Sequence, residues 1–205
     1  SLSVLLTKAF LTNNDAARGL VDPKWFDDGG SEGLIALSGA AQGELGSLLL
    51  GKKWALAHEA AERFKAQFPG RFYVELQRAG RPTDELATAR LANFAVEEQL
   101  PVVATHPIQF LKPEDFEAHE VRCSIAEGYT LQDPRRVKRY TPEQYLKSEA
   151  EMCELFADIP AAIENTVEIA KRCNLDGVLS KPQLPLFPTP DGMSLDDYID
   201  QLSKE

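Results

Sequence analysis

The sequence lacks the features that would direct it to a membrane, to secretion or to nucleotide binding. No stretch approaches the ~20 apolar residues of a membrane span, and the first residues lack the basic-then-apolar pattern of a signal peptide. Neither GxxxxGK[ST] nor GxGxxG occurs, so we interpret Ser38-Gly39 as an ordinary strand-to-helix turn. We expect a cytoplasmic protein that neither spans a membrane nor cradles phosphates.

Cysteine is scarce, and the spacing of the cysteines predicts neither disulfides nor a metal-binding CxxC motif. Cys123, Cys153 and Cys173 are odd in number and form no CxxC motif. Free thiols are typical of the cytosol, where disulfides are kept reduced. All three fall in helical patterns, and we expect them to be small buried hydrophobic residues.

Positive charge is also in short supply. The chain has 22 Lys and Arg against 32 Asp and Glu, a formal net charge of -10. An acidic surface repels phosphate backbones, so we do not expect this chain to bind DNA or RNA by itself. The one basic cluster, Asp133–Arg139 (DPRRVKR), is interpreted as a solvated loop.

What is present is an alternation of short apolar runs and helical patterns. We predict strands at Gly33–Gly39, Phe72–Leu76 and Val102–Ala104. Predicted helix signals include a Thr83 cap, Pro113 at a helix start with Gly128 at its end, and a capping box from Ser148 to Glu151. Other helices are predicted over 40–50, 54–68, 160–174 and 194–202, and near the first residues. For the helix after Thr83 we expect a core side made of Leu86, Ala89, Leu91, Phe94 and Val96.

This pattern predicts an α/β fold with parallel strands, too few for a complete barrel. The segment from Leu179 to Pro190, with prolines at 182, 185, 188 and 190, is expected to be an extended linker. Because the first residues already show helical spacing, we expect the chain to be a fragment of a longer protein.

A functional site is expected at the carboxyl ends of the predicted strands, where ligands bind in such folds. Glu75 lies inside a buried strand, so it must be either paired or metal-bound. We favour a pair with Arg78 or Arg81. His106 and His119 could share a metal, but their spacing resembles no local ligand pair and further ligands are missing, so structural roles are favoured.

One long string carries a specific resemblance. Ser148–Asn174 (SEAEMCELFADIPAAIENTVEIAKRCN) is similar to the segment that ends the PHP (polymerase and histidinol phosphatase) domain in bacterial C-family replicative polymerases. Matches in the same order are Gly33–Gly39, Tyr73–Leu76, Gly80–Pro82, Leu100–Thr105 and Phe116–Glu120. Leu184–Asp191 (LPLFPTPD) resembles the bridge from that domain to the polymerase palm.

The resemblance implies the later part of a distorted (β/α)7 PHP barrel at residues 1–178, lacking the first strands. Residues 179–205 would then be the linker and the start of the palm region.

The resemblance also implies a degenerate metal site. Family members that bind metal end the central strand in a pattern like A-T-N-D-x-H-Y, and here Pro107 replaces the aspartate and Gln109 the histidine. Ala40 stands where a cysteine often follows the Ser-Gly turn. His106 is one residue out of register and is the single weak candidate ligand. We therefore expect no catalytic, cofactor-binding or metal-binding residue in this chain.

By resemblance, the chain is part of a replicative DNA polymerase, a DNA-directed nucleotidyltransferase, and serves it as a non-catalytic scaffold. The implied partners are the proofreading exonuclease subunit and other holoenzyme subunits, while DNA and Mg²⁺ would be bound by the parent's other domains. The alternative is a metal-dependent PHP phosphoesterase or 3'-5' exonuclease, against which Ala40, Pro107 and Gln109 count. An unrelated α/β domain is a third interpretation.

Overall fold

The computed structural model describes residues 2–12, 19–27, 29–174 and 187–204. The chain divides into two compact units, residues 1–171 and 172–205, and we describe each by itself. The domain boundary that we predict after residue 178 lies outside the described residues and stays a prediction.

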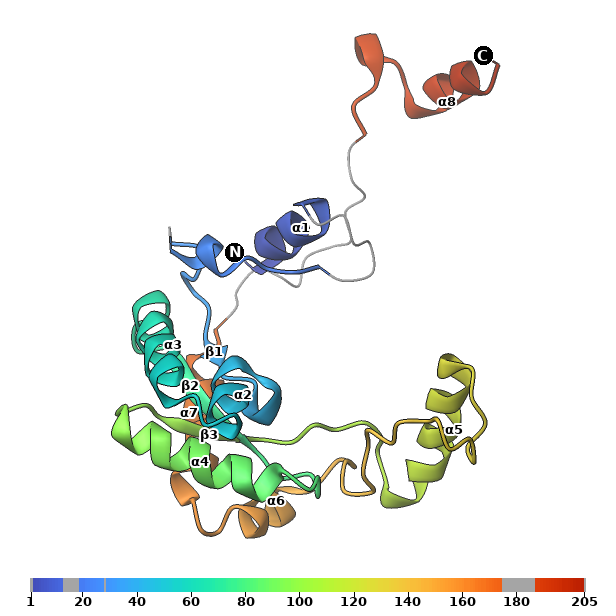
Figure 1. Ribbon diagram of the computed structural model, residues 1–205. Coiled ribbons are helices and arrows are strands. Elements are labelled where there is room, and N and C mark those ends of the chain that lie inside the picture. The colour runs from blue at the N-terminus through green and yellow to red at the C-terminus, as the bar shows by residue number, and fades with distance from the viewer. Residues whose placement is uncertain (1, 13–18, 28, 175–186, 205) are drawn as a thin grey trace. The chain divides into compact units, whose positions relative to one another are not determined.

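A parallel sheet organises the first unit (Figure 1). Its strands are β1 (Ala36–Leu37), β2 (Phe72–Gln77) and β3 (Val102–Thr105), in the order β1-β2-β3. Ala36 pairs with Phe72, and Val74 pairs with Val102. The predicted α/β class with parallel strands is therefore confirmed.

The first strand is much shorter than the predicted span Gly33–Gly39. Gly33 has a φ of +72°, and the Leu34 N–H donates to the Ser31 carbonyl, so these residues form a turn before the strand begins. Gly39 has a φ of +78° and turns the chain away after Ser38. The apolar run thus includes turn residues at both ends, and periodicity alone could not separate them from the strand.

Three helices form the main core with the sheet: α2 (Glu44–Leu50), α3 (Trp54–Gln67) and α4 (Asp84–Glu97). α2 contacts both α3 and α4, and α4 lies against β2. Apolar burial of this kind is the main favourable term in folding. The largest fully buried apolar side chains of the core are Leu45, Leu49, Val74, Leu76, Leu91, Phe94 and Phe156.

The predicted core side of α4 is only partly correct. Leu91 and Phe94 are buried, whereas Leu86 and Val96 are 50% and 79% exposed, and Ala89 is also exposed. Apolar residues occupy more than one face of this helix, so the sequence permits two stripes, and packing selects the one that also buries Ala87, Thr88 and Ala95.

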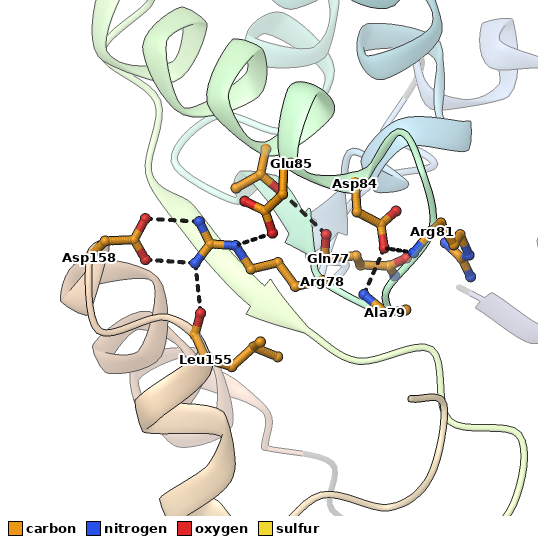
Figure 2. A network of polar contacts seen from close by, with 9 residues as sticks. Gln77, Arg78, Ala79, Arg81, Asp84, Glu85, Leu155 and Asp158 are labelled. Carbon is orange, nitrogen blue, oxygen red and sulfur yellow. Dashed lines mark hydrogen bonds and ion pairs between the residues drawn. The ribbon is translucent and has the colours of Figure 1, made fainter. Parts of the chain in front are cut away.

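The start of α4 also differs from the prediction. The Thr83 side chain makes no capping hydrogen bond. Instead, the Asp84 carboxylate, buried at the first turn, accepts from the backbone N–H groups of Ala79 (2.7 Å) and Arg81 (3.1 Å) (Figure 2). A carboxylate in the first turn complements the helix dipole, so Asp84 stabilises both the turn and the helix.

The amino-terminal residues form α1 (Leu2–Thr12), as the helical spacing predicted. Leu5 and Ala9 are buried, and the Lys8 ammonium lies over the Trp25 ring. Trp25 belongs to a short 3-10 helix, η1 (Pro23–Phe26), where the Asp22 side chain accepts from the Lys24 N–H. A second 3-10 turn, η2 (Ala40–Gln42), precedes α2.

A hairpin follows β3. It contains η3 (Pro113–Asp115) and α5 (Phe116–Glu127), and Gly128 ends the helix at a φ of +73°, so the predicted start and stop are confirmed. The basic cluster after it is not simply a solvated loop. The Arg136 side chain is 4% exposed and pairs with buried Glu120 of α5.

The helices α6 (Glu149–Leu155) and α7 (Pro160–Arg172) complete the first unit. The predicted capping box is confirmed: the Glu151 N–H donates to Ser148 Oγ, and the Ser148 N–H donates to the Glu151 carboxylate. α7 begins at Pro160 as predicted, and its Asn165 amide donates to the Val102 carbonyl (2.8 Å) at the start of β3. Val167 of this helix is an apolar residue that stays 53% exposed.

Arg78 joins these helices to the sheet (Figure 2). It follows β2 directly and makes a two-pronged ion pair with Asp158, Nη1 to Oδ1 at 2.6 Å and Nη2 to Oδ2 at 2.8 Å. Nη1 also donates to the Leu155 carbonyl (2.6 Å), and Nε lies 3.3 Å from a Glu85 oxygen. A bidentate guanidinium–carboxylate pair fixes geometry as well as adding energy, so it sets the position of the α6–α7 turn.

The cysteines do not fill the core as expected. Cys123 is half-buried, whereas Cys153 and Cys173 are exposed, and Cys173 lies just after α7 rather than on it. All three are free thiols, which agrees with the predicted lack of disulfides. In the described part of the chain, no helix combines the length and apolar character needed to cross a membrane.

In the second unit, η4 (Pro190–Gly192) precedes α8 (Leu195–Lys204). Ser194 caps α8, because its Oγ accepts from the Asp197 N–H (3.1 Å). This confirms the predicted helix near residues 194–202. Most of the predicted linker, residues 179–186, lies outside the described residues.

We predict that Asp158→Asn lowers the free energy of unfolding by about 1–2 kcal/mol, because Arg78 loses its two-pronged partner while Asp158 itself is partly screened by water. Hydrogen bonds from Arg78 lower the pKa of Asp158. The stabilisation is therefore full above the pKa of an unfolded aspartate and is lost as the pH falls through the lower folded value. Urea unfolding of both forms across this acidic range measures it.

Glu168→Gln is the matched control, since Glu168 pairs with Lys171 and both side chains are exposed. We expect this change to cost at most about 0.5 kcal/mol. Equal effects of the two substitutions would contradict the anchoring role of Arg78.

Candidate functional site at the carboxyl edge of the sheet

The parallel register brings polar side chains together where the three strands end. Gln77 at the end of β2 pairs with Thr105 at the end of β3, and the Ser38 N–H after β1 donates to the Tyr73 carbonyl. Glu75 lies between them, in the middle strand. This is the edge where the sequence predicted a site.

Glu75 is buried and accepts hydrogen bonds from groups on all three strand ends. Its Oε2 accepts from the Gly39 N–H (3.0 Å), and its Oε1 accepts from the Gln77 amide (3.0 Å) and the Thr105 hydroxyl. The Gln77 amide also donates to Thr105 Oγ1 (3.0 Å), and the Glu75 N–H donates to Ser38 Oγ (2.9 Å). The carboxylate thus closes a network across the whole edge.

The predicted Glu75–arginine pair is wrong. Arg78 pairs with Asp158 and Glu85 instead, and the partners of Glu75 are neutral donors. A buried carboxylate can be stabilised in this way, because charge-assisted hydrogen bonds replace those lost from water. Arg78 follows β2 by one residue and Arg81 lies in the turn beyond, so both are outside the strand that carries Glu75.

The turn after β1 is tightly packed and leaves little space for larger side chains. Gly39 and Ala40 both have positive φ values, +78° and +48°. A Cβ at Gly43 would meet the Ser38 carbonyl oxygen at 1.7 Å, so only glycine fits there. Ala40 is buried in this turn and carries only a methyl group. This degenerate ligand position therefore supplies no donor atom.

His106 faces the loop around residue 143 rather than Glu75. Its Nε2 lies 2.8 Å from the Glu143 carbonyl, which only a protonated nitrogen can approach as a donor. Burial lowers the pKa of His106, which favours the neutral form of the ring. Its Nδ1 is buried and has no hydrogen-bond partner among the described residues.

The two other degenerate ligand positions contact the same loop through their backbones. The Pro107 carbonyl accepts from the Gln144 amide (2.9 Å), and the Gln109 N–H donates to the Gln144 carbonyl (2.8 Å). The Gln109 side chain is exposed, while Gln144 is fully buried. His106, Pro107 and Gln109 therefore share one loop contact, two of them only through backbone atoms, and the methyl group of Ala40 adds no ligand to it.

His119, the second histidine considered as a metal ligand, lies in the α5 hairpin. It is buried against Phe110 and the edge of Tyr140, with Cys123 Sγ 3.8 Å from its Nε2. Burial lowers its pKa as well. No recorded contact within the described residues joins it to His106.

The donor set does not fit the metal centre that the fold family implies. Among the described residues, no group of three or more His, Cys, Asp or Glu side chains could hold an ion. Both oxygens of Glu75 already accept from protein donors, and His106 offers only its buried Nδ1, because its Nε2 donates to the Glu143 carbonyl. A two-metal phosphoesterase needs several free carboxylates and imidazoles. We assign no metal-dependent step to this edge, and the metal content stays a prediction.

Sequence reasoning located this edge but missed most of its members. Ser38 was interpreted only as part of a turn, Thr105 entered only a family match, and Gln77 was not singled out. Each is nevertheless a polar residue directly after a buried apolar run. That position is a usable signal, because parallel strands bring such residues to one edge. Gln144 carried no such signal, since it lies in a proline-containing loop.

Comparisons with known proteins agree with the resemblance that the sequence predicted. Residues 1–79 match the model of the PHP domain. The DNA polymerase III subunit alpha of Neisseria meningitidis serogroup B is 49% identical over 206 residues. Those of Pseudomonas fluorescens and Escherichia coli K12 are 46% identical over 203 residues and 45% identical over 205 residues. The predicted resemblance is therefore confirmed.

These alignments cover 99–100% of this chain but only 17–18% of each relative. The chain thus spans less than a fifth of the length of these relatives. Each alignment covers one segment of the relative, and the match to the PHP model lies in the first 79 residues of this chain.

We predict that Glu75→Gln destabilises the fold by about 1–3 kcal/mol. The amide N–H₂ of the substituted side chain must face either the Gly39 N–H or the donors of Thr105 and Gln77. In both orientations two buried hydrogen-bond donors face each other without an acceptor. Denaturant unfolding measures the loss. Glu97→Gln, an exposed carboxylate at the end of α4, is the control and should stay within about 0.5 kcal/mol of the original protein.

Proposed function

We infer that the chain is the PHP-domain segment of a bacterial DNA polymerase III alpha subunit, and we propose that it serves that polymerase as a non-catalytic scaffold. The inference rests on alignments that cover this whole chain at 45–49% identity. The parent protein would be a DNA-directed DNA polymerase of chromosomal replication. Its nucleotidyl transfer, its Mg²⁺ ions and its grip on DNA would belong to domains outside this chain.

The proposal extends to the architecture. The sheet of β1, β2 and β3 would be part of the distorted PHP barrel, and residues 179–205 would lead to the palm. The consecutive parallel strands with intervening helices support this reading. We place the subunit in the cytoplasm, in keeping with its free cysteines.

The scaffold role is supported by the closed network around Glu75. A carboxylate whose two oxygens are held by Gly39, Gln77 and Thr105 braces the sheet rather than offering ligands to an ion. The partner that we propose is the proofreading exonuclease subunit, together with other holoenzyme subunits. The net charge of -10 disfavours direct binding of nucleic acid by this segment.

We predict that His106→Ala in the full alpha subunit changes polymerase activity on primed DNA by less than about twofold. His106 is the one candidate that a metal-dependent phosphoesterase or 3'-5' exonuclease could use here. The same preparations should show no hydrolysis of a DNA 3' end when Mn²⁺ or Zn²⁺ is added.

Metal-dependent 3' hydrolysis that disappears in His106→Ala would replace the scaffold with the enzymatic alternative. Lys147→Ala is a suitable control, because Lys147 belongs to the same loop contact but is no metal ligand, pairing instead with Glu143. Loss of hydrolysis in both variants would indicate a shared structural effect instead.

A further inference from the structure

Two side chains with acid–base and nucleophilic chemistry lie one turn apart on α5, outside the network around Glu75. His119 and Cys123 are four residues apart, so their side chains share one face of the helix. Cys123 Sγ lies 3.9 Å from His119 Nδ1 and 3.8 Å from its Nε2. Whichever nitrogen carries the proton of the neutral ring, a nitrogen with a free lone pair therefore lies beside the thiol.

The surroundings of His119 leave its ring nitrogens to this thiol. The residue is 7% exposed, and within the part of the chain that the structure describes, Cys123 is the single hydrogen-bonding group recorded at the ring. The other close neighbours are aromatic: the ring centroids of Phe110 and Tyr140 lie 5.5 Å and 4.6 Å away. A contact of this length to sulfur is weak, so the buried ring keeps its capacity to accept a proton.

The charge state of His119 suits that role. Burial lowers the pKa of the ring, the charge of Arg122 lowers it further, and Glu120 acts in the opposite direction. The lowered pKa favours the neutral form, which has the free lone pair. Arg122 also places a cation next to Cys123 in the chain, and a nearby cation favours a thiolate.

The three cysteines differ in exposure and in environment. Cys123 is half-buried, whereas Cys153 and Cys173 are exposed. Among the described residues, neither Cys153 nor Cys173 has a recorded contact with a histidine. Reactive cysteines are partly exposed thiols beside an imidazole or a cation. Exposure and environment therefore rank the three thiols in opposite orders, which makes the environment of Cys123 testable inside one molecule.

We propose that Cys123 is a site of reversible oxidation by hydrogen peroxide, with His119 as the base. The Cys123 thiol passes its proton to His119, and the sulfur attacks one peroxide oxygen. An S–O bond forms and the O–O bond breaks, so the sulfur is oxidised and the peroxide is reduced. His119 returns the proton to the leaving hydroxide, which gives water and a sulfenic acid at Cys123. A sulfenic acid is restored by reaction with thiols.

The test compares the three thiols within the full alpha subunit. The protein is treated with hydrogen peroxide in the presence of dimedone, a dione that traps sulfenic acids. Mass spectrometry of the peptides then gives the rate of trapping at each cysteine. We expect Cys123 to react at least about threefold faster than Cys153 and Cys173, because its environment outweighs its lower exposure. A Cys123 rate no higher than those of the two exposed thiols would overturn the proposal.

His119→Gln tests the base, because glutamine keeps a polar side chain but does not take up a proton. General bases contribute about 100-fold or more to rates, so we expect this change to slow trapping at Cys123 at least about tenfold and to leave Cys153 and Cys173 unchanged. His58→Gln is the matched control, since it makes the same change at a histidine of α3 that pairs with Glu98.

Circular dichroism checks that both variants are folded. An unchanged Cys123 rate in folded His119→Gln would overturn the role of His119. If His119→Gln fails to fold, the comparison of the three thiols in the original protein still decides whether Cys123 is the reactive one. Neither result depends on the scaffold role, which stands or falls separately.

Discussion

The fold depends on satisfying one buried carboxylate. Glu75 sits in the middle strand of a parallel sheet, where a charge without partners would cost several kcal/mol. Donors from the ends of all three strands remove that cost, and in doing so they fix the turn at Gly39 and the register of Gln77 with Thr105. The same constraint bears on the chemistry of this edge. Because both oxygens of the carboxylate accept hydrogen bonds from protein donors, they are poorly available as ligands for a metal ion.

A second set of polar contacts attaches the helices α6 and α7 to the sheet. Arg78 follows β2 and grips the α6–α7 turn through Asp158 and the Leu155 carbonyl, while Asn165 of α7 bonds to the first residue of β3. Glu75 and Arg78 are three positions apart, so the edge network and the helical anchor meet at the end of β2. The helices that follow the sheet are thereby held against it by contacts between residues 63 to 80 positions apart in the chain.

Strong local signals predicted much of this fold. The parallel strands, the capping box at Ser148 and the helix stop at Gly128 depend on nearby residues, and each was found where expected. Long-range pairing was not accessible in the same way. The partner of Glu75 was taken to be a nearby arginine, whereas Gly39 and Thr105 come from other strands, and Arg136 was read as a loop charge although it is buried against Glu120. On α4, two apolar stripes compete, and only packing against β2 selects the face of Leu91 and Phe94.

The metal content of the full alpha subunit tests the central claim most directly. The protein is purified without chelator, dialysed, and analysed by elemental mass spectrometry for zinc, manganese and iron. If Glu75 is a structural carboxylate and Ala40, Pro107 and Gln109 are empty ligand positions, these metals are substoichiometric. A tightly held ion in every chain, lost on His106→Ala, would show instead that this edge of the sheet is a metal centre.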